Sequence, residues 1–430
     1  MVIQGRLNIN QESSLKTVNP GQGIGTLLNH VGEHHHALSA HVMPIFQTST
    51  FSFDTVQAAV DSFTGVDKES YVYTRGRNPN SALLAQKIAY LEGIDLIKAA
   101  PDKDVYDIVD AYVCGSGMGA ITASVRSRMK AGDKALVQAS IYGGTHTFWS
   151  EIAPRYGISA SFVKSFDLED WKQAFVDADE ISVVYVESPA NPTMEVQDLK
   201  GLAELAHEHG AWLIVDNTFA TPYHQKPLTF GADMVVHSST KYIGGHGVAT
   251  GGIIVCRHPE FVNLFSDLWQ LASELGASPS PNDSWLMAMG LKTLELRMQR
   301  HSSNAMQIAN YMQQHKKVKT VLYPGLPDFR YHDMAKKQMD NGFGGLVSFE
   351  LAGGASSAAG FIDSLTLPAI AISLGSTDSL IQCPASMTHR NMPGAEREAA
   401  GITDGLIRFS VGIENIEDLI ADLDQALNQI

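Results

Sequence analysis

The chain has 430 residues, and its 31 Lys and Arg against 46 Asp and Glu give a formal net charge of −15. A chain of this length can bury a large core without disulfides or a structural metal, which excludes small stapled scaffolds. The acidic balance argues against nucleic-acid and anionic-membrane partners, and no stretch approaches the roughly 20 apolar residues that a membrane span needs.

The first residues contain no apolar core of a secretion signal, and the cysteines (Cys114, Cys256 and Cys383) are too scattered for a disulfide framework or a metal pair. We therefore expect a cytoplasmic protein. Residues 1–70 have few periodic segments and predict an extended arm. The run His34, His35 and His36 could bind metal, but consecutive side chains point in different directions, so a solvated loop is favoured and no metal is expected.

From about residue 105, short apolar runs alternate with amphipathic stretches, the pattern of βαβ units. The clearest helix is expected over Asp198–His209, with Gly210 after its end. Several strands are too apolar to be exposed on one face, which predicts a sheet buried on both sides. The expected strands are Asp110–Cys114, Lys134–Ala139, Ser161–Lys164, Ile181–Val186, Ala211–Val215, Asp233–His237 and Gly252–Cys256.

A boundary is expected near residue 280, where Pro279 and Pro281 precede a long helical pattern that reaches Met298, with Asn282 or Asp283 as its N-cap. The strands and helix expected beyond it are Gly345–Glu350, Leu406–Val411 and Ile416–Leu427. The predicted division is an arm (1–70), a large α/β domain (71–280) and a smaller α+β domain (281–430).

Polar residues follow three predicted strands: Glu187 after the fourth, Asp216 after the fifth, and Ser238 to Lys241 after the sixth. Open α/β sheets bind ligands at this edge. A lysine, an acid and hydroxyls suit pyridoxal phosphate (PLP), whose carbonyl reacts with lysine, whose ring nitrogen pairs with a carboxylate, and whose phosphate accepts hydrogen bonds.

Gly115-Ser116-Gly117-Met118-Gly119-Ala120 also imitates a dinucleotide fingerprint. That site would need an acid at the end of the next strand, which instead ends in Gln138-Ala139-Ser140. The sequence therefore disfavours a nicotinamide or flavin enzyme.

Segment 215–246 (VDNTFATPYHQKPLTFGADMVVHSSTKYIGGH) resembles the cofactor-lysine region of the trans-sulfuration family of PLP enzymes, which includes methionine γ-lyase and the cystathionine lyases. Similar matches are PIFQTSTF, YTRGRNPN, GSGMGAI, YGGTH, ESPANPT, GLKTLELRM, SLGSTDSLIQCPASMTH and GLIRFSVG. The resemblance implies the fold-type I PLP-dependent transferase fold, with a mostly parallel seven-stranded sheet, helices on both faces, an N-terminal arm and a smaller C-terminal domain.

The resemblance also implies residue roles. Lys241 would form the Schiff base and carry protons, Asp216 would pair with the ring nitrogen, and Tyr142 would stack on the ring and protonate the leaving group. The phosphate would be held by backbone N–H groups of Gly117 and Met118 and by Ser238 and Thr240.

Residues outside this core complete the implied site. Tyr73 and Arg75 of the arm would reach the phosphate of a neighbouring subunit, in a homotetramer built as a dimer of dimers. Arg408 would hold the substrate carboxylate, with Ser373 beside it and Asn191 near the ring hydroxyl. A charge on an edge strand is the alternative interpretation of Arg408.

The reaction depends on the leaving group. Ile372 stands where cystathionine-handling relatives commonly carry glutamate, which favours γ-elimination from methionine or homocysteine to 2-oxobutanoate, ammonia and a thiol. Against this, Gly144 replaces the cysteine of methionine γ-lyases, and a lysine typical of them is absent from Leu268–Gly276.

Alternatives therefore stay open. They are cystathionine γ-lyase or γ-synthase, O-acylhomoserine sulfhydrylase, and an inactive scaffold relative. Residues 97–110 lengthen the chain beyond the family pattern and predict a surface insertion, and burial is favoured over a substrate contact for Cys383.

Overall fold

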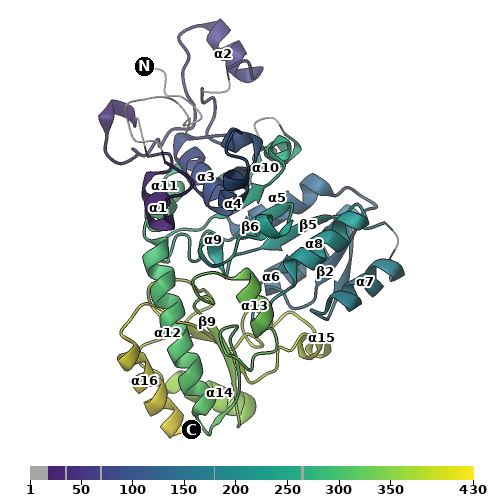
Figure 1. The fold of residues 1–430 in the computed structure, drawn as a ribbon, viewed down its shortest axis with the longest axis vertical. Coiled ribbons are helices and arrows are strands. Elements are labelled where there is room, and N and C mark those ends of the chain that lie inside the picture. Colours follow the sequence, from purple (N-terminus) through teal and green to yellow (C-terminus); the bar gives the residue numbers. More distant parts are fainter. Residues whose placement is uncertain (1–17, 34–35, 68–69, 179, 263–265) are drawn as a thin grey trace. The chain divides into compact units, whose positions relative to one another are not determined.

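The computed structural model describes residues 18–33, 36–67, 70–178, 180–262 and 266–430 (Figure 1). The protein divides into two compact units. The first runs to Arg128 and takes in Pro227–Gly244 and Val248–Glu295, and the second comprises Met129–Lys226, Gly245–Gly247 and Leu296–Ile430. The predicted boundaries at residues 70 and 280 stay a prediction.

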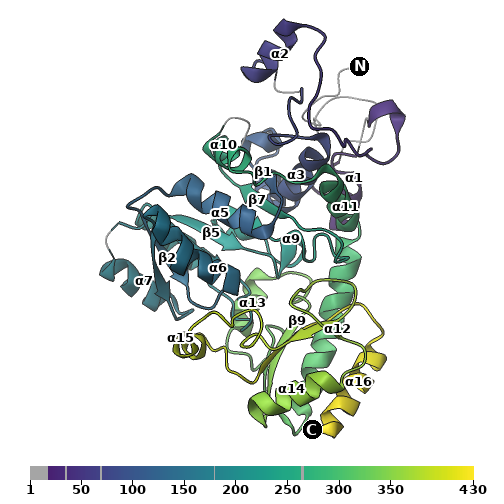
Figure 2. The same cartoon turned by 180° about the vertical axis from the view of Figure 1, so that it is seen from behind.

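The first unit contains three strands of the large sheet, with β7 between β1 and β6 and antiparallel to both. Figure 2 shows β1 and β7 side by side. Every residue of β7 is buried, because helices α3 and α5 pack on these strands. The strands are β1 (Asp110–Cys114), β6 (Met234–His237) and β7 (Gly252–Cys256). The helices are α1 (Ile24–His30), α2 (Val56–Phe63), α3 (Pro79–Glu92), α4 (Ile94–Ala99), α5 (Gly117–Arg128), α10 (Asp267–Glu274) and α11 (Pro281–Leu291).

The arm is partly buried, not simply solvated. His36 is 6% exposed and contacts Glu33 at 3.1 Å, so the expected solvated loop is wrong for this residue; His34 and His35 lie outside the described residues. Glu33 also pairs with Lys87 at 3.0 Å and with Lys292 at 2.9 Å. These ion pairs join the arm to α3 and to the chain after α11.

The second unit contains the other four strands of the large sheet, in the order β5-β4-β2-β3 and all parallel. β4 is fully buried, whereas β3, at the end of this order, is largely accessible. The strands are β2 (Lys134–Gln138), β3 (Ser159–Val163), β4 (Val183–Glu187) and β5 (Trp212–Asp216). The predicted α/β class and mostly parallel large sheet are confirmed.

Helix α8 (Leu199–Glu208) shows why the prediction of a helix at this point succeeds. Asp198 accepts a hydrogen bond from the Gly201 N–H at 3.0 Å, and Gly210 has a φ of 72° after the helix end. Its apolar face packs on β5 and on α7 (Leu168–Asp177). Shorter helices of this unit are α6 (Gly143–Thr147), α9 (Thr221–His224), α13 (His332–Gln338) and α15 (Gly394–Ala399).

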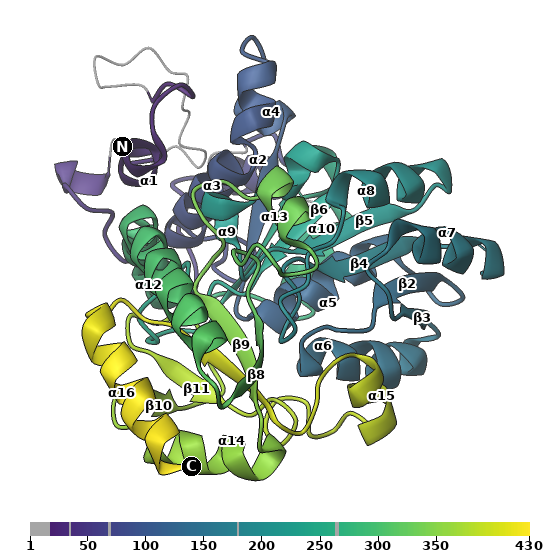
Figure 3. The same cartoon turned by 60° about the horizontal axis from the view of Figure 1, so that its bottom comes forward.

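A second sheet of five strands has the order β10-β11-β12-β9-β8, and helices α14 and α16 lie together beside it (Figure 3). β12 is the central strand and is fully buried. The elements are β8 (Val318–Leu322), β9 (Leu346–Leu351), β10 (Ala369–Ile370), β11 (Leu380–Gln382), β12 (Leu406–Ser410), α14 (Gly354–Ser364) and α16 (Ile416–Gln429).

Two helical expectations need correction. The N-cap of α11 is Ser280, whose hydroxyl accepts from the Asp283 N–H at 3.3 Å, and not Asn282 or Asp283. The expected continuous helix stops at Leu291, and α12 (Leu294–Gln314) begins anew. Among the described residues, no helix combines the length and apolarity needed to cross a bilayer.

The expected surface insertion at 97–110 is only partly accessible. Residues 101–103 are exposed, but Ile97, Val105 and Val109 are buried. Cys383 is half-buried.

Candidate active site

The turn between β1 and α5 lies directly against the turn after β6. A Cβ placed on Gly117 would be 2.8 Å from the Ser238 Cβ, so this position has no room for a side chain. The first N–H groups of α5, including those of Gly117 and Met118, lack partners within the helix. Such a crowded, N–H-rich turn is suited to a phosphate group.

The segment after β6 forms a tight turn that presents Lys241. The Lys241 N–H donates to the Ser238 carbonyl at 3.1 Å, and the Gly251 N–H donates to the Thr240 hydroxyl at 3.0 Å. The Thr240 hydroxyl in turn lies 3.3 Å from the Gly251 carbonyl. The first unit therefore brings Gly117, Ser238, Thr240 and Lys241 into one region.

A buried contact between His237 and Glu92 holds the strand end from which this turn starts. His237, the last residue of β6, contacts Glu92 at 2.7 Å, and both side chains are fully buried. Glu92 ends α3, so the pair ties the C-terminal end of α3 to the strand that precedes Ser238.

Tyr73 and Arg75 lie at the surface of the first unit. Tyr73 is 48% exposed, and the Arg75 guanidinium lies 5.6 Å from the centre of its ring. Arg75 pairs with Glu274 at 2.8 Å, and this hydrogen bond raises its pKa. Their expected contact with a neighbouring subunit stays a prediction.

In the second unit, Asp216 ends β5 and has hydrogen bonds on both carboxylate oxygens. Oδ2 accepts from the Tyr185 hydroxyl at 3.4 Å, and Oδ1 accepts from the Thr218 N–H at 2.9 Å. These bonds fix the orientation of the carboxylate at the end of the strand.

Glu187 joins the two segments that carry Tyr142 and Asn191. Its Oε1 accepts from the Tyr142 N–H at 2.9 Å, and its Oε2 accepts from the Asn191 N–H at 3.4 Å. Burial, followed by the charge of Asp216, raises the pKa of Glu187 well above its usual range. The sequence places Glu187 at a strand end, but nothing in the sequence indicates this bridging role.

Arg408 is 2% exposed on the central strand β12, so the edge-strand interpretation is wrong. Its Nη1 donates to the Asn191 Oδ1 at 3.1 Å, and its Nη2 donates to the Ser373 carbonyl at 2.9 Å. Gln382 is the register partner of Arg408 on β11, and its side-chain amide lies within hydrogen-bonding distance of the guanidinium. The predicted cofactor residue Asn191 therefore lies together with the predicted substrate residues Ser373 and Arg408.

Tyr142 and Ile372 line one cavity of about 400 Å³. The Tyr142 ring is 39% exposed and Ile372 is 62% exposed. A Cβ at position 144 would lie 2.6 Å from the Tyr142 ring, so the ring in this conformation occupies the space that a side chain at position 144 would need. The other lining residues are Gly143, His146, Thr147, Ser386, Met387, Thr388, His389, Arg390, Asn391 and Met392.

The side chains present suit PLP. The first unit has a crowded glycine turn beside Ser238 and the lysine turn, and the second has an oriented aspartate, an accessible tyrosine ring and a buried arginine. These groups match the phosphate, aldehyde, ring nitrogen and ring face of that cofactor.

Comparisons with known proteins agree with this chemistry. The family model described as "Cys/Met metabolism PLP-dependent enzyme" matches residues 25–428. A protein of Fusobacterium nucleatum subsp. polymorphum named L-methionine gamma-lyase is 42% identical over 409 residues, which cover 95% of this chain and 98% of that protein. A Dictyostelium discoideum protein named cystathionine gamma-lyase is 38% identical, over 94% of this chain and 98% of that one.

The fold agrees as well. The crystal structure of cystathionine gamma synthase from Xanthomonas oryzae pv. oryzae in complex with cystathionine has a TM-score of 0.85 to this chain at 37% identity, covering 95% of this chain and 98% of that one.

Proposed function

Because the chain belongs to the Cys/Met metabolism family of PLP-dependent enzymes, we propose that it eliminates the γ-substituent of a sulfur amino acid of the methionine or homocysteine type. With methionine, substrate and water give 2-oxobutanoate, ammonia and methanethiol. Relatives named L-methionine gamma-lyase, at 42% and 40% identity, support this choice.

The cavity lined by Tyr142 and Ile372 is the observation that carries the proposal. Among the described residues that line it there is no carboxylate, while Ile372, Met387 and Met392 supply apolar surface. A distal ammonium would lack an acidic partner there, whereas a thioether loses little when it leaves water. The cavity therefore favours a short uncharged side chain.

Bound PLP would supply a sink for the electrons released at the substrate Cα. The Lys241 amine would hold the cofactor and move protons at Cα and Cβ, and the Tyr142 hydroxyl would donate a proton to the departing sulfur. Asp216 would hold the ring nitrogen in its protonated form. The phosphate would accept from Gly117 and Met118 N–H groups and from Ser238 and Thr240.

Arg408 would orient the substrate through its carboxylate. Its guanidinium is already held by Asn191 and by the Ser373 carbonyl, so little ordering remains when a substrate binds. Ile372 would contact the distal group.

We also propose a homotetramer built as a dimer of dimers, in which Tyr73 and Arg75 complete the site of a neighbouring subunit. The apolar side chains of α2 support a covered face, since Val56 is 83% exposed and Phe63 is 65% exposed. The cytoplasmic location expected from the sequence stays a prediction.

One experiment tests the reaction: the purified holoenzyme is incubated with L-methionine, L-homocysteine, L-cystathionine, or O-acetyl-L-homoserine with and without sulfide. We expect the highest kcat/KM for the first two, with 2-oxobutanoate and methanethiol from methionine and 2-oxobutanoate and hydrogen sulfide from homocysteine. Efficient conversion of only cystathionine or only O-acetylhomoserine would overturn the assignment.

Cystathionine cleavage is the second candidate. Arg390 lines the cavity and could pair with the distal carboxylate of that substrate. Relatives named cystathionine gamma-lyase and cystathionine beta-lyase, at 38% and 41% identity, agree with it.

A further inference from the structure

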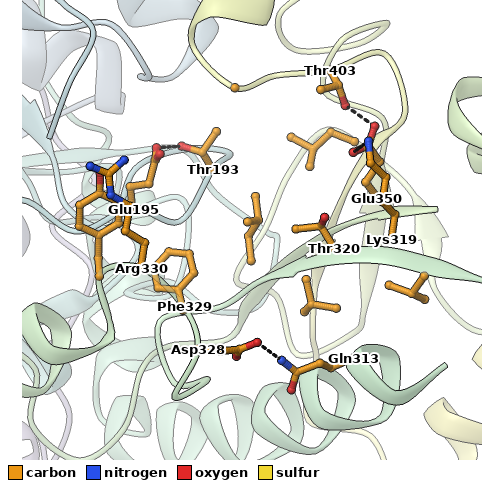
Figure 4. A pocket seen from close by; sticks show the side chains of 16 residues that line it. Thr193, Glu195, Gln313, Lys319, Thr320, Asp328, Phe329, Arg330, Glu350 and Thr403 are labelled. Atoms are coloured by element: carbon orange, nitrogen blue, oxygen red, sulfur yellow. Dashed lines mark hydrogen bonds and ion pairs between the residues drawn. The ribbon is translucent and has the colours of Figure 1, made fainter. Parts of the chain in front are cut away.

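A second cavity, of about 500 Å³, lies in the second unit and shares no lining residue with the one beside Tyr142. It is formed by β8, the loop 328–331, the segment 193–195 and residues 401–406. Figure 4 shows Phe329 beside Glu195 and Arg330 on one side of the cavity, with Lys319 and Glu350 on the other.

Both cations of this cavity already have a carboxylate partner. Arg330 pairs with Asp167, which lies outside the cavity, at 2.7 Å. Lys319 pairs with Glu350 at 3.0 Å, and Glu350 also accepts from the Thr403 hydroxyl at 3.1 Å. These positive charges are therefore largely neutralised.

The two remaining acids have only neutral hydrogen-bond partners. Glu195 Oε2 accepts from the Thr193 hydroxyl at 2.5 Å, and Asp328 Oδ2 accepts from the Gln313 amide at 2.5 Å (Figure 4). Within the described part of the chain, neither acid forms an ion pair with any of the cations. The cavity thus carries an excess of negative charge.

The position of Glu195 adds a second feature. Burial raises its pKa to about 7, although the Thr193 hydrogen bond and the Arg330 charge act in the opposite direction. The ionised form is therefore short of favourable partners, and a cation placed beside it would supply one. The other charged or titratable groups near it or lining the cavity are Asp167, Lys319, Asp328, Arg330, Tyr331 and Glu350.

The surface between the acids is apolar. Phe329 and Leu406 are buried side chains of the wall, and Leu322 is half-buried beside them. Aromatic and aliphatic surface beside unpaired carboxylates is the chemistry that binds an organic ammonium ion. We propose that this cavity is a binding site for a small organic cation, whose charge lies against Glu195 and whose apolar body lies against Phe329.

The test is isothermal titration of the holoenzyme with benzyltrimethylammonium, which has no N–H and so cannot react with an aldehyde. We expect one site per chain at pH 8. Because the cation lies against Glu195, whose pKa of about 7 falls within this pH range, affinity should be up to about tenfold weaker at pH 6.

Three variants identify the site. Glu195→Gln keeps an acceptor for Thr193 but removes the charge, so it should weaken binding at least about tenfold and abolish the pH dependence. Asp328→Asn, at an exposed position, should weaken binding less. Glu417→Gln, on the exposed face of α16, should change nothing.

Absence of binding to the wild type would overturn the proposal, as would equal affinity at pH 6 and 8. Unchanged binding in Glu195→Gln would do the same. If the Glu195→Gln protein loses its cofactor or no longer unfolds in a cooperative thermal transition, the Asp328→Asn protein takes its place in the test. Unchanged affinity for the cation in Asp328→Asn then overturns the proposal. Turnover is not measured, so a failure here is independent of the proposed reaction.

Discussion

Glu187 and Asp216 are register partners at the ends of the parallel strands β4 and β5. Glu187 is 4% exposed, and burial and the charge of Asp216 raise its pKa. Two adjacent carboxyls in such a place do not both ionise easily, which favours the protonated form of Glu187. A protonated Glu187 adds no repulsion to the Asp216 carboxylate that the proposed ring contact needs.

The two hydrogen bonds that Glu187 accepts lead to a prediction for two substitutions. Glu187→Ala leaves the buried N–H groups of Tyr142 and Asn191 without acceptors, at about 1–3 kcal/mol each, and should lower kcat/KM by about 10- to 100-fold. Glu187→Gln keeps an acceptor for one of the two N–H groups and should therefore lose roughly half as much free energy, about 3- to 10-fold in kcat/KM. Steady-state kinetics and PLP affinity are measured, with exposed Glu208→Gln as control. A Gln variant as impaired as the Ala variant would show that the charge of Glu187 is needed.

Lys241→Ala should lower turnover by about 10²- to 10⁴-fold or more, because the proton carrier is removed. Cofactor binding should persist in part through the phosphate contacts at Gly117 and Ser238. Dialysis followed by absorbance of the retained cofactor measures this. Lys200→Ala, on the exposed face of α8, is the control. Wild-type rates in the Lys241→Ala protein would show that the lysine takes no part in the reaction.

Shared sites predict that inactive Arg75→Ala and inactive Lys241→Ala proteins regain activity when their subunits are mixed. A mixed dimer would contain one intact site, so an equal mixture should reach about a quarter of wild-type activity. Mixing Lys241→Ala with Asp216→Ala is the matched control, since both residues would come from the same subunit and no intact site would form. If verified subunit exchange restores nothing in the first mixture, the arm does not serve a neighbouring site.

Position 372 is expected to control substrate choice. Ile372→Glu supplies a carboxylate for a distal ammonium and should shift the ratio of kcat/KM toward cystathionine by about 1–3 kcal/mol in transition-state free energy. Ile372→Gln, of similar size without charge, should shift it less. A wild type that already prefers cystathionine, with a ratio unmoved by Ile372→Glu, would favour the second candidate function.

The ion pairs of the arm predict a pH-dependent stability difference. Burial alone would raise the pKa of Glu33, but the hydrogen bond from His36 and the charge of Lys87 outweigh it and lower the pKa from 4.5 to about 2. This stabilisation is complete above pH 4.5 and is lost as the pH falls toward 2.

Glu33→Gln should therefore lower the free energy of unfolding at pH 7 by about 3–5 kcal/mol, since Lys87 stays buried without its carboxylate. Urea unfolding should show a smaller difference from wild type at about pH 3.5, where the wild type has lost part of the same contribution. Exposed Glu398→Gln is the control, and a difference that does not change with pH would contradict the role of Glu33.

Sequence reasoning predicts elements whose signal is local. Strand β7 matches its expected bounds. Helix α8 differs from its expected bounds by only one residue at each end, since Asp198 and Gly210 mark where the helix begins and ends. The break after α11 and the Ser280 cap are missed, because apolar spacing continues across the break from Leu291 to Leu294.

Contacts between distant segments could not be predicted in the same way. Asn191 and Arg408 are 217 residues apart in the chain, yet their side chains share a hydrogen bond. The bridge from Glu187 to Tyr142 and the burial of His36 likewise depend on packing that no periodicity records. The roles assigned through the family resemblance stay predictions that the variants above can test.

The carbonyls of Ile372 and Ser373 both face the Arg408 guanidinium, while the Ile372 side chain is 62% exposed. The two parts of Ile372 thus have separate contacts: its carbonyl lies beside the Arg408 guanidinium, the proposed anchor of the substrate α-carboxylate, and its side chain lines the cavity. Mutations at position 372 can change the side chain without touching the carbonyl. Under the proposed role of Arg408, single codon changes at this position are a route by which substrate preference changes in evolution while the carboxylate anchor is kept.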